Sequence, residues 1–392
     1  MRIGVDACCW ANQRGFGRFT RELLTELLRI DRDNNYWFFV DRNTASQNQF
    51  PENARIVDIP TNIPPSEAAS AKGHRSVGDL WAMTRHVWKY KLDLFFFPAI
   101  YSYFPILNRA AIAVTVHDTI PSDHPESVFA NKRLQFFWNL KEFAAFKQAD
   151  MIVTVSEHSK KQILKHSRLS ESQIRIIPEG PSSIFQQMPR DGHSSQILSK
   201  FNIQPQERFL LYVGGISPHK NLKTLINAYA QLQDEPQFAD VKLVLVGDYE
   251  NDPFYSDYPA LKQLVGQLAV QNKIYFTGFV ADSDLVYLYN AASLLVLPSL
   301  QEGFGLPAME ALACGAPVAA SSTGSLPEIL GESAQYFDPQ NQDEMCRIIR
   351  KILADQNLAQ KMKENGLQRA AQYSWTKASQ QALSIFREMT GR

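Results

Sequence analysis

Two glutamates separated by seven residues flank the stretch of this chain that is best suited to hold an anion. Glu302 follows an apolar run, residues 293–298, that is typical of a strand buried on both faces. Pro307 suits the first turn of a helix, so the N–H groups of residues 304–306 are expected at the positive end of that helix. Glu310 lies one turn further on. The pattern predicts a phosphate site between two carboxylates, and the competing interpretation is an ordinary turn and helix whose glutamates face solvent.

A lysine in the second half of the chain could supply positive charge to such a site. Lys220 stands just before a predicted helix and follows an apolar strand, residues 209–213, that ends in two glycines. A strand, a glycine pair and a lysine before a helix are similar to a phosphate loop, but the spacing is not Gly-x-x-x-x-Gly-Lys-Ser/Thr. ATP hydrolysis through that motif is therefore excluded.

These two segments resemble the donor-binding motifs of the retaining nucleotide-sugar glycosyltransferases of family 4. The resemblance includes the Glu-x7-Glu spacing, residues 315–318 (Gly-Ala-Pro-Val) and residues 324–328 (Gly-Ser-Leu-Pro-Glu). It implies that Glu302 lies beside the donor sugar, that Glu310 holds the ribose hydroxyls and that Lys220 grips the diphosphate. The other donor contacts that it implies are Gly215, where many relatives have arginine, the backbone around Phe279 and Val280, and the amides of Phe304, Gly305 and Leu306.

The first half of the chain offers two further segments that the resemblance places at the ligand. Gly15, Gly17 and Arg18 are expected in a loop between the strand at residues 2–7 and the next helix, either as a turn that needs positive φ angles or as a contact for the donor phosphate or the acceptor. His117 and Asp118 follow the strand at residues 111–116, and ligands collect at the carboxyl ends of such strands. The resemblance brings the histidine to the donor sugar. Arg18 or His219 could then compensate for the missing arginine at Gly215.

Residues 124–148 combine aromatic side chains with lysines and arginine. The favoured interpretation is a helix that buries Phe136, Phe137, Leu140 and Phe143 in the core. The alternative is a surface for an acceptor or an anionic membrane that involves Lys132, Arg133 and Lys141.

The composition sets the class of protein. A chain of 392 residues with 45% hydrophobic and 20% charged residues and a net charge of zero is typical of a folded protein that does not work by coating nucleic acid. Four cysteines without metal-type spacing predict a reducing environment, the cytoplasm or the inner face of the plasma membrane. Two Asp-x-Asp sequences, at 31–33 and 282–284, are interpreted as a solvated turn and a helix start, so no metal or other cofactor is expected.

Alternating strands and helices predict two doubly wound α/β domains that face a cleft, the GT-B fold that the resemblance implies. The expected boundaries are 1–180 for the first domain, 181–206 for a linker and 207–374 for the second domain, with a last helix at about 375–392 that returns to the first.

The predicted function is retaining transfer of a hexose from a nucleotide diphosphate sugar to a hydroxyl of a glycan or lipid-linked glycan. UDP-glucose is slightly preferred over GDP-mannose, the product is expected in surface or extracellular polysaccharide, and Glu302, His117, Lys220 and Asp118 are the expected catalytic residues. Weak peripheral contact with an anionic membrane is part of this prediction. The alternatives are a non-catalytic sugar-nucleotide-binding protein and a dinucleotide-binding oxidoreductase built on the Gly-Phe-Gly sequence at 15–17.

Overall fold

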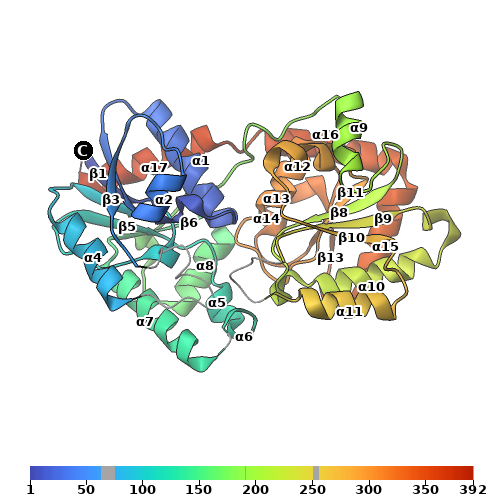
Figure 1. The fold of residues 1–392 in the computed structure, drawn as a ribbon, viewed down its shortest axis with the longest axis horizontal. Helices are drawn as coiled ribbons and strands as arrows, with labels where there is room; N and C mark the ends of the chain where they lie inside the picture. The colour runs from blue at the N-terminus through green and yellow to red at the C-terminus, as the bar shows by residue number, and fades with distance from the viewer. Residues whose placement is uncertain (63–75, 130, 190, 250–255, 392) are drawn as a thin grey trace. The chain divides into compact units, whose positions relative to one another are not determined.

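The chain folds into two compact α/β units in a computed structural model that describes residues 1–62, 76–129, 131–189, 191–249 and 256–391 (Figure 1). The first unit comprises Met1–Glu179 and Trp375–Arg392, and the second comprises Gly180–Ser374. Each unit is one parallel sheet with helices on both faces. The predicted fold class, two doubly wound parallel-sheet domains, is confirmed.

The first unit is built on a seven-stranded parallel sheet with the order β3-β2-β1-β4-β5-β6-β7. Its central strand, β4, is apolar along its whole length, because helices shield both faces from water. The strands are β1 (Arg2–Asp6), β2 (Asn35–Asp41), β3 (Ala54–Ile59), β4 (Leu94–Phe97), β5 (Ala111–Thr115), β6 (Met151–Thr154) and β7 (Ile174–Ile176). The α-helices are α1 (Gly15–Ile30), α2 (Arg42–Gln47), α4 (Val77–Trp88), α5 (Ile120–Asp123), α6 (Pro125–Val128), α7 (Lys132–Gln148), α8 (Glu157–His166) and α17 (Trp375–Thr390).

The second unit is built on a six-stranded parallel sheet with the order β10-β9-β8-β11-β12-β13. The strands are β8 (Phe209–Val213), β9 (Lys242–Val246), β10 (Ile274–Gly278), β11 (Leu294–Leu297), β12 (Val318–Ser321) and β13 (Ala334–Phe337). The α-helices are α9 (Gly192–Ser199), α10 (Leu222–Gln233), α11 (Tyr258–Gln267), α12 (Asp282–Ala291), α13 (Leu306–Ala313), α14 (Leu326–Leu330), α15 (Gln342–Ala354) and α16 (Gln356–Ala370). Strand β11 pairs with β8 on one side and β12 on the other, so the loops that follow these three strands emerge side by side.

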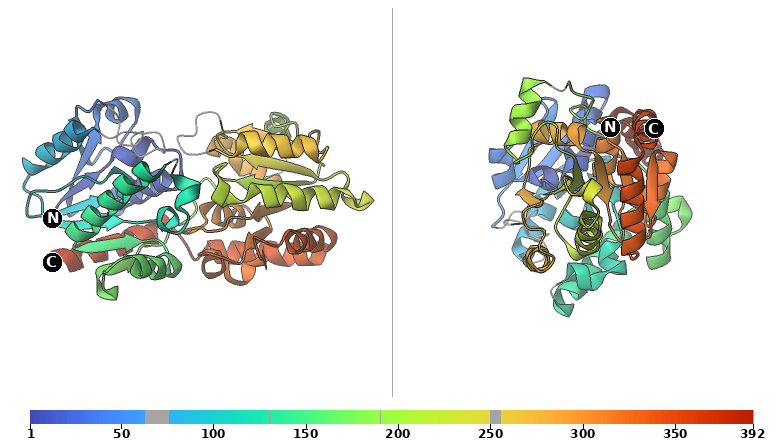
Figure 2. Two further views of the ribbon diagram at one scale, coloured as in Figure 1. Left: turned by 90° about the horizontal axis from the view of Figure 1, so that it is seen from below. Right: turned by 90° about the vertical axis from the view of Figure 1, so that its right-hand side faces the viewer.

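The last helix of the chain, α17, is part of the first unit. Phe386 packs on Phe96 of β4 with ring centroids 5.2 Å apart, and Ser379 donates a hydrogen bond of 3.2 Å to the carbonyl of Leu23 in α1. The two ends of the chain lie next to each other (Figure 2), where the Thr390 hydroxyl is 3.1 Å from the sulfur of Met1. The first unit is therefore discontinuous in sequence.

Two segments expected to be irregular carry regular structure. The polar, proline-rich composition of residues 41–75 indicates mostly loop, yet residues 42–59 contain α2 and the edge strand β3; residues 63–75 of this stretch lie outside the described residues. Residues 181–206, expected as a linker, belong to the second unit and contain α9. Ile197, Leu198 and Ile203 are buried there, so short apolar runs between prolines were enough to form a helix and its packing.

The turn at residues 31–33 is only partly solvated: Arg32 and Asp33 are exposed as expected, but Asp31 is not. Asp31 is buried, and its carboxylate accepts hydrogen bonds from the Tyr36 hydroxyl, from the side-chain amide of Asn34 at 2.7 Å and from the backbone of Asp33 at 3.1 Å. Burial by itself would raise the pKa of Asp31, but these hydrogen bonds lower it overall. The carboxylate thus stabilises the turn before β2.

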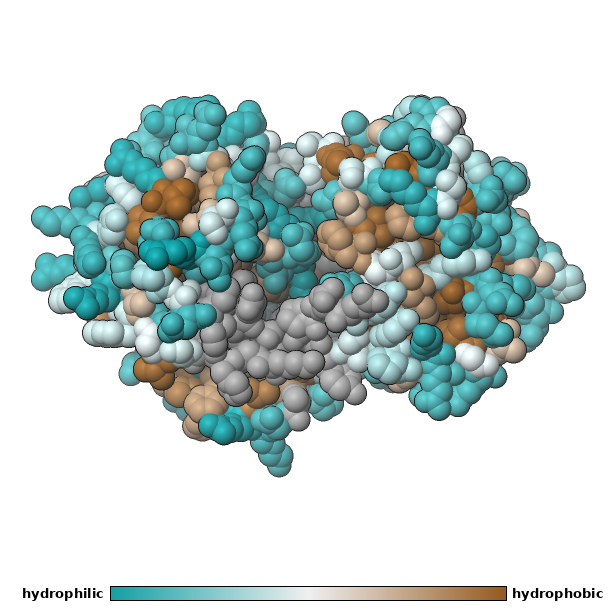
Figure 3. Space-filling view, in the orientation of Figure 1, coloured by the Kyte–Doolittle hydropathy of each residue, from teal (hydrophilic) through white to brown (hydrophobic). Residues whose placement is uncertain are grey.

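The predicted burial of the aromatic side chains of α7 is wrong. Phe136, Phe137, Leu140 and Phe143 all point outward and are 53–63% exposed. Ala145 is the buried residue of this helix, and Trp138 and Phe146 also pack towards the sheet. Figure 3 shows hydrophobic residues along the edge of the first unit where Figure 1 places α7.

Candidate nucleotide-sugar site

The loop between β11 and α13 is set by one glycine and one proline. Gly305 adopts φ +93° and ends the loop, and Pro307 occupies the first turn of α13. A side chain at Gly305 would also bring its Cβ within 2.5 Å of Leu326. In the part of the chain that the structure describes, the backbone N–H groups of Phe304 and Gly305 donate no hydrogen bond. Two amides at the positive end of a helix are thus available to an anion.

Lys220 and Glu302 form an ion pair directly before this helix. Lys220 Nζ lies 2.6 Å from Glu302 Oε1, and their side chains are 18% and 13% exposed. The Ser299 hydroxyl donates to the same oxygen at 2.7 Å. The lysine therefore contacts the loop that leads into α13, at a residue four positions before the helix begins.

The loops that carry these two residues are joined by their backbones. Lys220 ends a short 3-10 turn, Pro218–Lys220, between β8 and α10. The amide of Leu300 donates to the carbonyl of His219 at 2.9 Å, and the Asn221 side chain donates to the carbonyl of Pro298 at 3.0 Å. The position of Lys220 relative to Glu302 is thus fixed by three hydrogen bonds, the ion pair included.

A third loop, after β12, forms hydrogen bonds with the backbone on which Glu302 lies. The Ser325 hydroxyl donates to the Glu302 carbonyl at 3.0 Å, and the Thr323 hydroxyl donates to the Leu300 carbonyl at 2.7 Å. Gly324 lies between them with φ +69°, and a Cβ there would stand 2.9 Å from the amide nitrogen of Glu302. The Gly-Ser sequence at 324–325 therefore holds the backbone of the catalytic candidate.

Glu310 is held differently from Glu302. It is buried in α13, and its Oε2 accepts a hydrogen bond of 2.9 Å from the hydroxyl of Tyr289 in α12. Burial and the charge of Glu310 raise the pKa of the nearby Cys314 thiol, which is inert as a nucleophile while it carries its proton. Glu310 is a fixed acceptor inside the second unit.

Comparison with known proteins places this chain in a family. Residues 194–369 match the family model described as glycosyl transferases group 1, and residues 14–181 match the model described as glycosyltransferase family 4. The O-antigen chain mannosyltransferase B of Escherichia coli is 32% identical over 289 residues, which is 72% of this chain and 71% of that protein. The chain belongs to glycosyltransferase family 4.

Two other similarities define the extent of the match. The serotype-specific mannosyltransferase WbdA of Escherichia coli is 30% identical over 271 residues, 69% of this chain, but the match spans only about a third (32%) of WbdA. The structure of the sucrose-phosphate synthase of Thermosynechococcus elongatus superposes with a TM-score of 0.77 at 22% identity, over 100% of this chain and 99% of that one. This structural match shows the GT-B fold of the family 4 enzymes.

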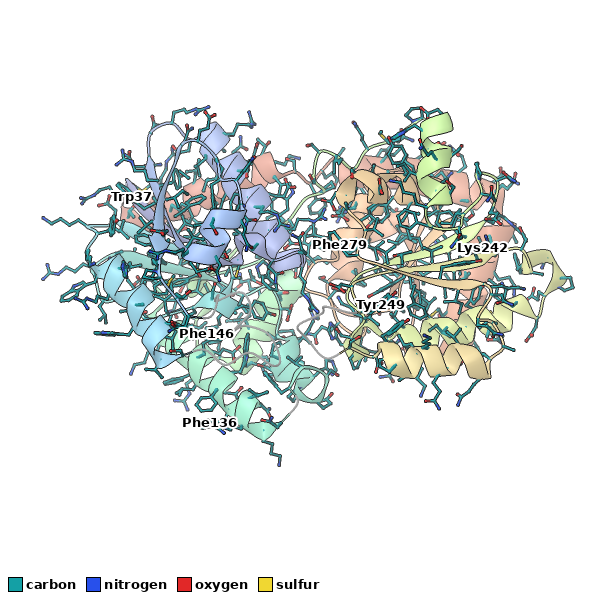
Figure 4. The ribbon with its side chains drawn as sticks, in the orientation of Figure 1. Trp37, Phe136, Phe146, Lys242, Tyr249 and Phe279 are labelled. Carbon is teal, nitrogen blue, oxygen red and sulfur yellow. The ribbon has the colours of Figure 1, made fainter. Side chains whose placement is uncertain are left out.

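Phe279 and Val280, the residues predicted to lie at the nucleobase, follow β10. Val280 is buried, whereas the side chain of Phe279 is 59% exposed (Figure 4). Gly278, which precedes them, has φ +73°, and a Cβ added at this position would lie 3.9 Å from the ring of Tyr249. The sequence interpretation considered only backbone groups here, and the exposed ring adds a flat apolar surface to them.

His117 of the first unit is enclosed by protein groups. It is 8% exposed, its Nε2 is 3.0 Å from the Pro98 carbonyl, and its Nδ1 is 3.4 Å from Glu179 Oε1. The ring of Phe19 lies edge-on to it at 4.8 Å. Glu179, which sequence reasoning missed because no motif marks it, fixes this ring. Asp118 follows with an oxygen 3.0 Å from the amide of Ile120.

Gly15 and Gly17 are not loop residues, because α1 begins at Gly15, and neither has a positive φ angle. A Cβ at Gly17 would lie 2.0 Å from the carbonyl oxygen of Asn12, so this glycine lets the first turn of α1 approach the preceding chain. The loop on which a dinucleotide-binding oxidoreductase would depend is therefore absent at residues 15–17. Arg18 is partly exposed on α1.

Three features complete the description of the site. The Gly215 carbonyl accepts a hydrogen bond of 2.7 Å from the Tyr212 hydroxyl. Among the residues that the structure describes, no three His, Cys, Asp or Glu side chains are grouped to hold a metal ion. Lys220 and Glu302 are brought together in the second unit, and Glu310 lies in α13 of the same unit, whereas His117, Asp118, Gly15, Gly17 and Arg18 belong to the first.

Replacing Gly324 by alanine is expected to lower both stability and activity. The new Cβ would collide with the Glu302 backbone at a positive φ angle, which should cost about 1–3 kcal/mol of folding free energy and displace the carboxylate. A displacement of this kind should reduce kcat/KM by roughly tenfold or more. Thermal unfolding and steady-state kinetics of the purified variant measure the two effects.

Gly266→Ala is the matched control. Gly266 lies near the end of α11, and no atom comes within 4 Å of the point where an alanine Cβ would stand, so alanine there should be neutral or stabilising. If Gly324→Ala behaved like Gly266→Ala in both measurements, the supporting role of the loop after β12 would be disproved.

Proposed function

We propose that this family 4 enzyme transfers a hexose from a nucleotide diphosphate sugar to a hydroxyl group of a glycan, with retention at the anomeric carbon. The observation that carries the proposal is the Lys220–Glu302 pair at the start of α13, 2.6 Å between charged atoms. A cation and open backbone amides suit a diphosphate, and the adjacent carboxylate suits the hydroxyls of a sugar.

The proposed chemistry depends on stabilising the leaving group. As the bond between the anomeric carbon and the diphosphate oxygen breaks, negative charge builds on that oxygen, and Lys220 with the amides of Phe304 and Gly305 would stabilise it. The acceptor oxygen forms the new bond to the anomeric carbon, and its proton passes to the departing diphosphate. The reaction then needs no metal ion, which is part of the proposal.

Glu302 and Glu310 are assigned binding roles. Glu302 would orient the sugar while its charge is balanced by Lys220, and Glu310 would accept hydrogen bonds from the ribose hydroxyls. Phe279 offers an exposed ring for the nucleobase. His117 and Asp118 remain proposed contacts of the sugar, although the environment of His117 favours a positioning role for its ring.

The proposed donor is GDP-mannose, which revises the sequence-based preference for UDP-glucose. The reason is that both sequence relatives described above are named mannosyltransferases. No residue of the site distinguishes the two donors. The proposed acceptor is a glycan or lipid-linked glycan of surface polysaccharide, because one of these relatives is named for O-antigen chains.

The structure describes no helix long and apolar enough to cross a membrane. As a separate part of the proposal, the enzyme acts in the cytoplasm, with weak peripheral contact to an anionic membrane where a lipid-linked acceptor would be presented.

The test is incubation of the enzyme with GDP-mannose, UDP-glucose and their relatives, each with and without EDTA. We expect slow hydrolysis of one donor, unaffected by EDTA, with release of the sugar in the anomeric configuration of the donor. Lys220→Ala serves as the control for contaminating hydrolases.

The competing function is non-catalytic binding of sugar nucleotides, which the glycine at position 215 favours because it removes one cation from the loop. Calorimetric binding of a donor without hydrolysis, and without transfer to any glycan supplied, would establish that function. If the protein binds no donor and turns none over, the proposed site itself is refuted.

A further inference from the structure

Helix α7 exposes large apolar side chains of the kind that a surface helix normally buries. Its outward stripe of large apolar side chains consists of Phe136, Phe137, Leu140 and Phe143, two of them 63% exposed. Figure 4 shows Phe136 at the outer edge of the helix. A water-exposed helix normally places such residues against the core and its charges outside.

The charged residues in the middle of the same helix point inward. Lys141 Nζ lies 3.8 Å from the centre of the Trp138 ring and donates a hydrogen bond of 3.2 Å to the Tyr101 carbonyl. Burial raises the pKa of Glu142, its neighbour. Lys141, which the sequence suggested as a surface cation, is therefore part of the packing. The inner side of α7 thus includes charged groups, and its outer side includes large apolar side chains.

Helix α4 extends the same surface. Trp81 and Trp88 are 58% and 63% exposed, and α4 and α7 pack on one face of the sheet, since Met83 and Ala145 join the same buried cluster (Figure 1). The segment between them is bonded to both helices: the Pro105 carbonyl accepts from Thr84 of α4, and the amide of Ile106 donates to Gln148 of α7. Leu107, on this segment, is also exposed.

The exposed charges of α4, α7 and the segment at residues 105–109 have one sign. Over residues 77–91, 105–109 and 132–148, every exposed charged side chain is basic, although the chain as a whole has a net charge of zero. The two acidic residues of these segments, Asp79 and Glu142, are not exposed. The basic residues are Arg85, Lys89, Lys91, Arg109, Lys132, Arg133 and Lys147. We call these residues, with the exposed apolar side chains among them, the aromatic–basic face.

We propose that the aromatic–basic face docks on an anionic lipid bilayer. Phe, Leu and Trp side chains can enter the interface between headgroups and acyl chains, and the surrounding Lys and Arg attract anionic headgroups. On α7 the cations lie at both ends of the apolar stripe, Arg133 before it and Lys147 after it, so the helix would lie parallel to the surface. A second copy of the chain fits less well, because two such faces would oppose their positive charges. The inference adds a membrane-binding surface to the proposed function. It rests on that function only for the reason that the contact would exist, which is to reach a lipid-linked acceptor.

Sedimentation with vesicles tests the proposal without any sugar. Wild-type protein should bind vesicles of phosphatidylcholine and phosphatidylglycerol at a roughly 2:1 ratio, bind pure phosphatidylcholine at least about tenfold more weakly, and dissociate as salt rises. The variant Phe136→Ser/Phe143→Ser should bind roughly tenfold or more weakly. Ile184→Ser, a partly exposed apolar residue of the second unit, should bind like wild type.

Tryptophan fluorescence provides a measurement that folding defects do not imitate. Insertion of Trp81 and Trp88 should shift the emission of the wild type to shorter wavelength on anionic vesicles, and Trp81→Phe/Trp88→Phe should lose the shift. We expect Phe136→Ser/Phe143→Ser to keep the donor hydrolysis and the unfolding temperature of the wild type. Its loss of vesicle binding would then test the membrane contact independently of the proposed chemistry.

Three results would overturn the proposal. One is an absence of vesicle binding by the wild type at low salt. Another is equal binding by Phe136→Ser/Phe143→Ser and wild type. The third is a wild-type dimer in analytical ultracentrifugation that Phe136→Ser/Phe143→Ser converts to a monomer, which would identify the face as a contact between copies.

Discussion

Lys220→Ala is expected to lower kcat/KM for the sugar nucleotide by roughly a hundredfold, about 2.7 kcal/mol of transition-state stabilisation. Lys220 Nζ donates one hydrogen bond in the described structure, to Glu302, and an ammonium group has three donors. Two donors are thus available to a diphosphate whose charge grows as the glycosidic bond breaks. Steady-state kinetics with the preferred donor measures the loss.

The ion pair itself makes the control variants informative. Ser299→Ala removes only the hydroxyl that shares Glu302 Oε1, so it should lower kcat/KM by less than tenfold. Glu302→Ala should lower it by at least about tenfold, and the double variant with Lys220→Ala should lose less than the two single losses combined, because the residues act as a pair. Unfolding temperatures control for the partly buried charge that each single variant leaves behind.

Near-normal kinetics in both Lys220→Ala and Glu302→Ala would show that the reaction does not use this pair. Full additivity of two large effects would instead show that each acts alone. Binding of the nucleoside diphosphate product, measured by calorimetry, should weaken in Lys220→Ala and not in Ser299→Ala.

The parts of this site that are local in sequence could be predicted from it. An apolar run, Gly305 and Pro307 fix a strand, a turn and a helix start through backbone preferences alone. The approach of Lys220 to that helix start, across 82 residues, followed from the rule that parallel strands present their carboxyl ends together, aided by the family resemblance. The direct pairing of Lys220 with Glu302 did not follow, since it depends on hydrogen bonds between two loops.

The features that sequence reasoning missed depend on neighbours distant in the chain. Gly17 is required by the carbonyl of Asn12 and not by a positive φ angle. The ring of His117 is held by Glu179, which follows β7, two strands along the sheet from β5 and 62 residues later in the chain. Helix α7 has apolar residues on several sides, so periodicity could not tell which side faces the sheet. Ala145, with Trp138 and Phe146, makes that contact, and the other phenylalanines of the helix do not.

Glu310→Gln is expected to raise the KM for the donor by roughly tenfold while leaving the fold intact. The amide oxygen of glutamine can still accept the hydrogen bond from Tyr289, so the buried hydroxyl keeps a partner. The negative charge is lost, and a charged acceptor binds a hydroxyl about twice as strongly as a neutral one. Initial rates over a range of donor concentration measure the KM, and thermal unfolding measures stability.

The control for Glu310→Gln is Tyr289→Phe, which keeps the carboxylate and removes the hydroxyl that orients it. Tyr289 is fully buried, and its ring packs edge-on against Phe185 at 5.5 Å, so phenylalanine should fit with a loss of about 1 kcal/mol. Its KM should rise less than that of Glu310→Gln, because the charge stays in place.

A donor that lacks the ribose hydroxyls decides whether Glu310 acts on them directly. The KM of the wild type for the 2′-deoxy or the 3′-deoxy donor should exceed its KM for the intact donor by about the same factor that Glu310→Gln produces. The reason is that the deoxy donor and the substitution each remove one partner of the same hydrogen bond. In Glu310→Gln the deoxy donor should then bring little further loss. If the two losses add in full for both deoxy donors, Glu310 does not contact the ribose, and its buried carboxylate serves only to hold α13 against α12 through Tyr289.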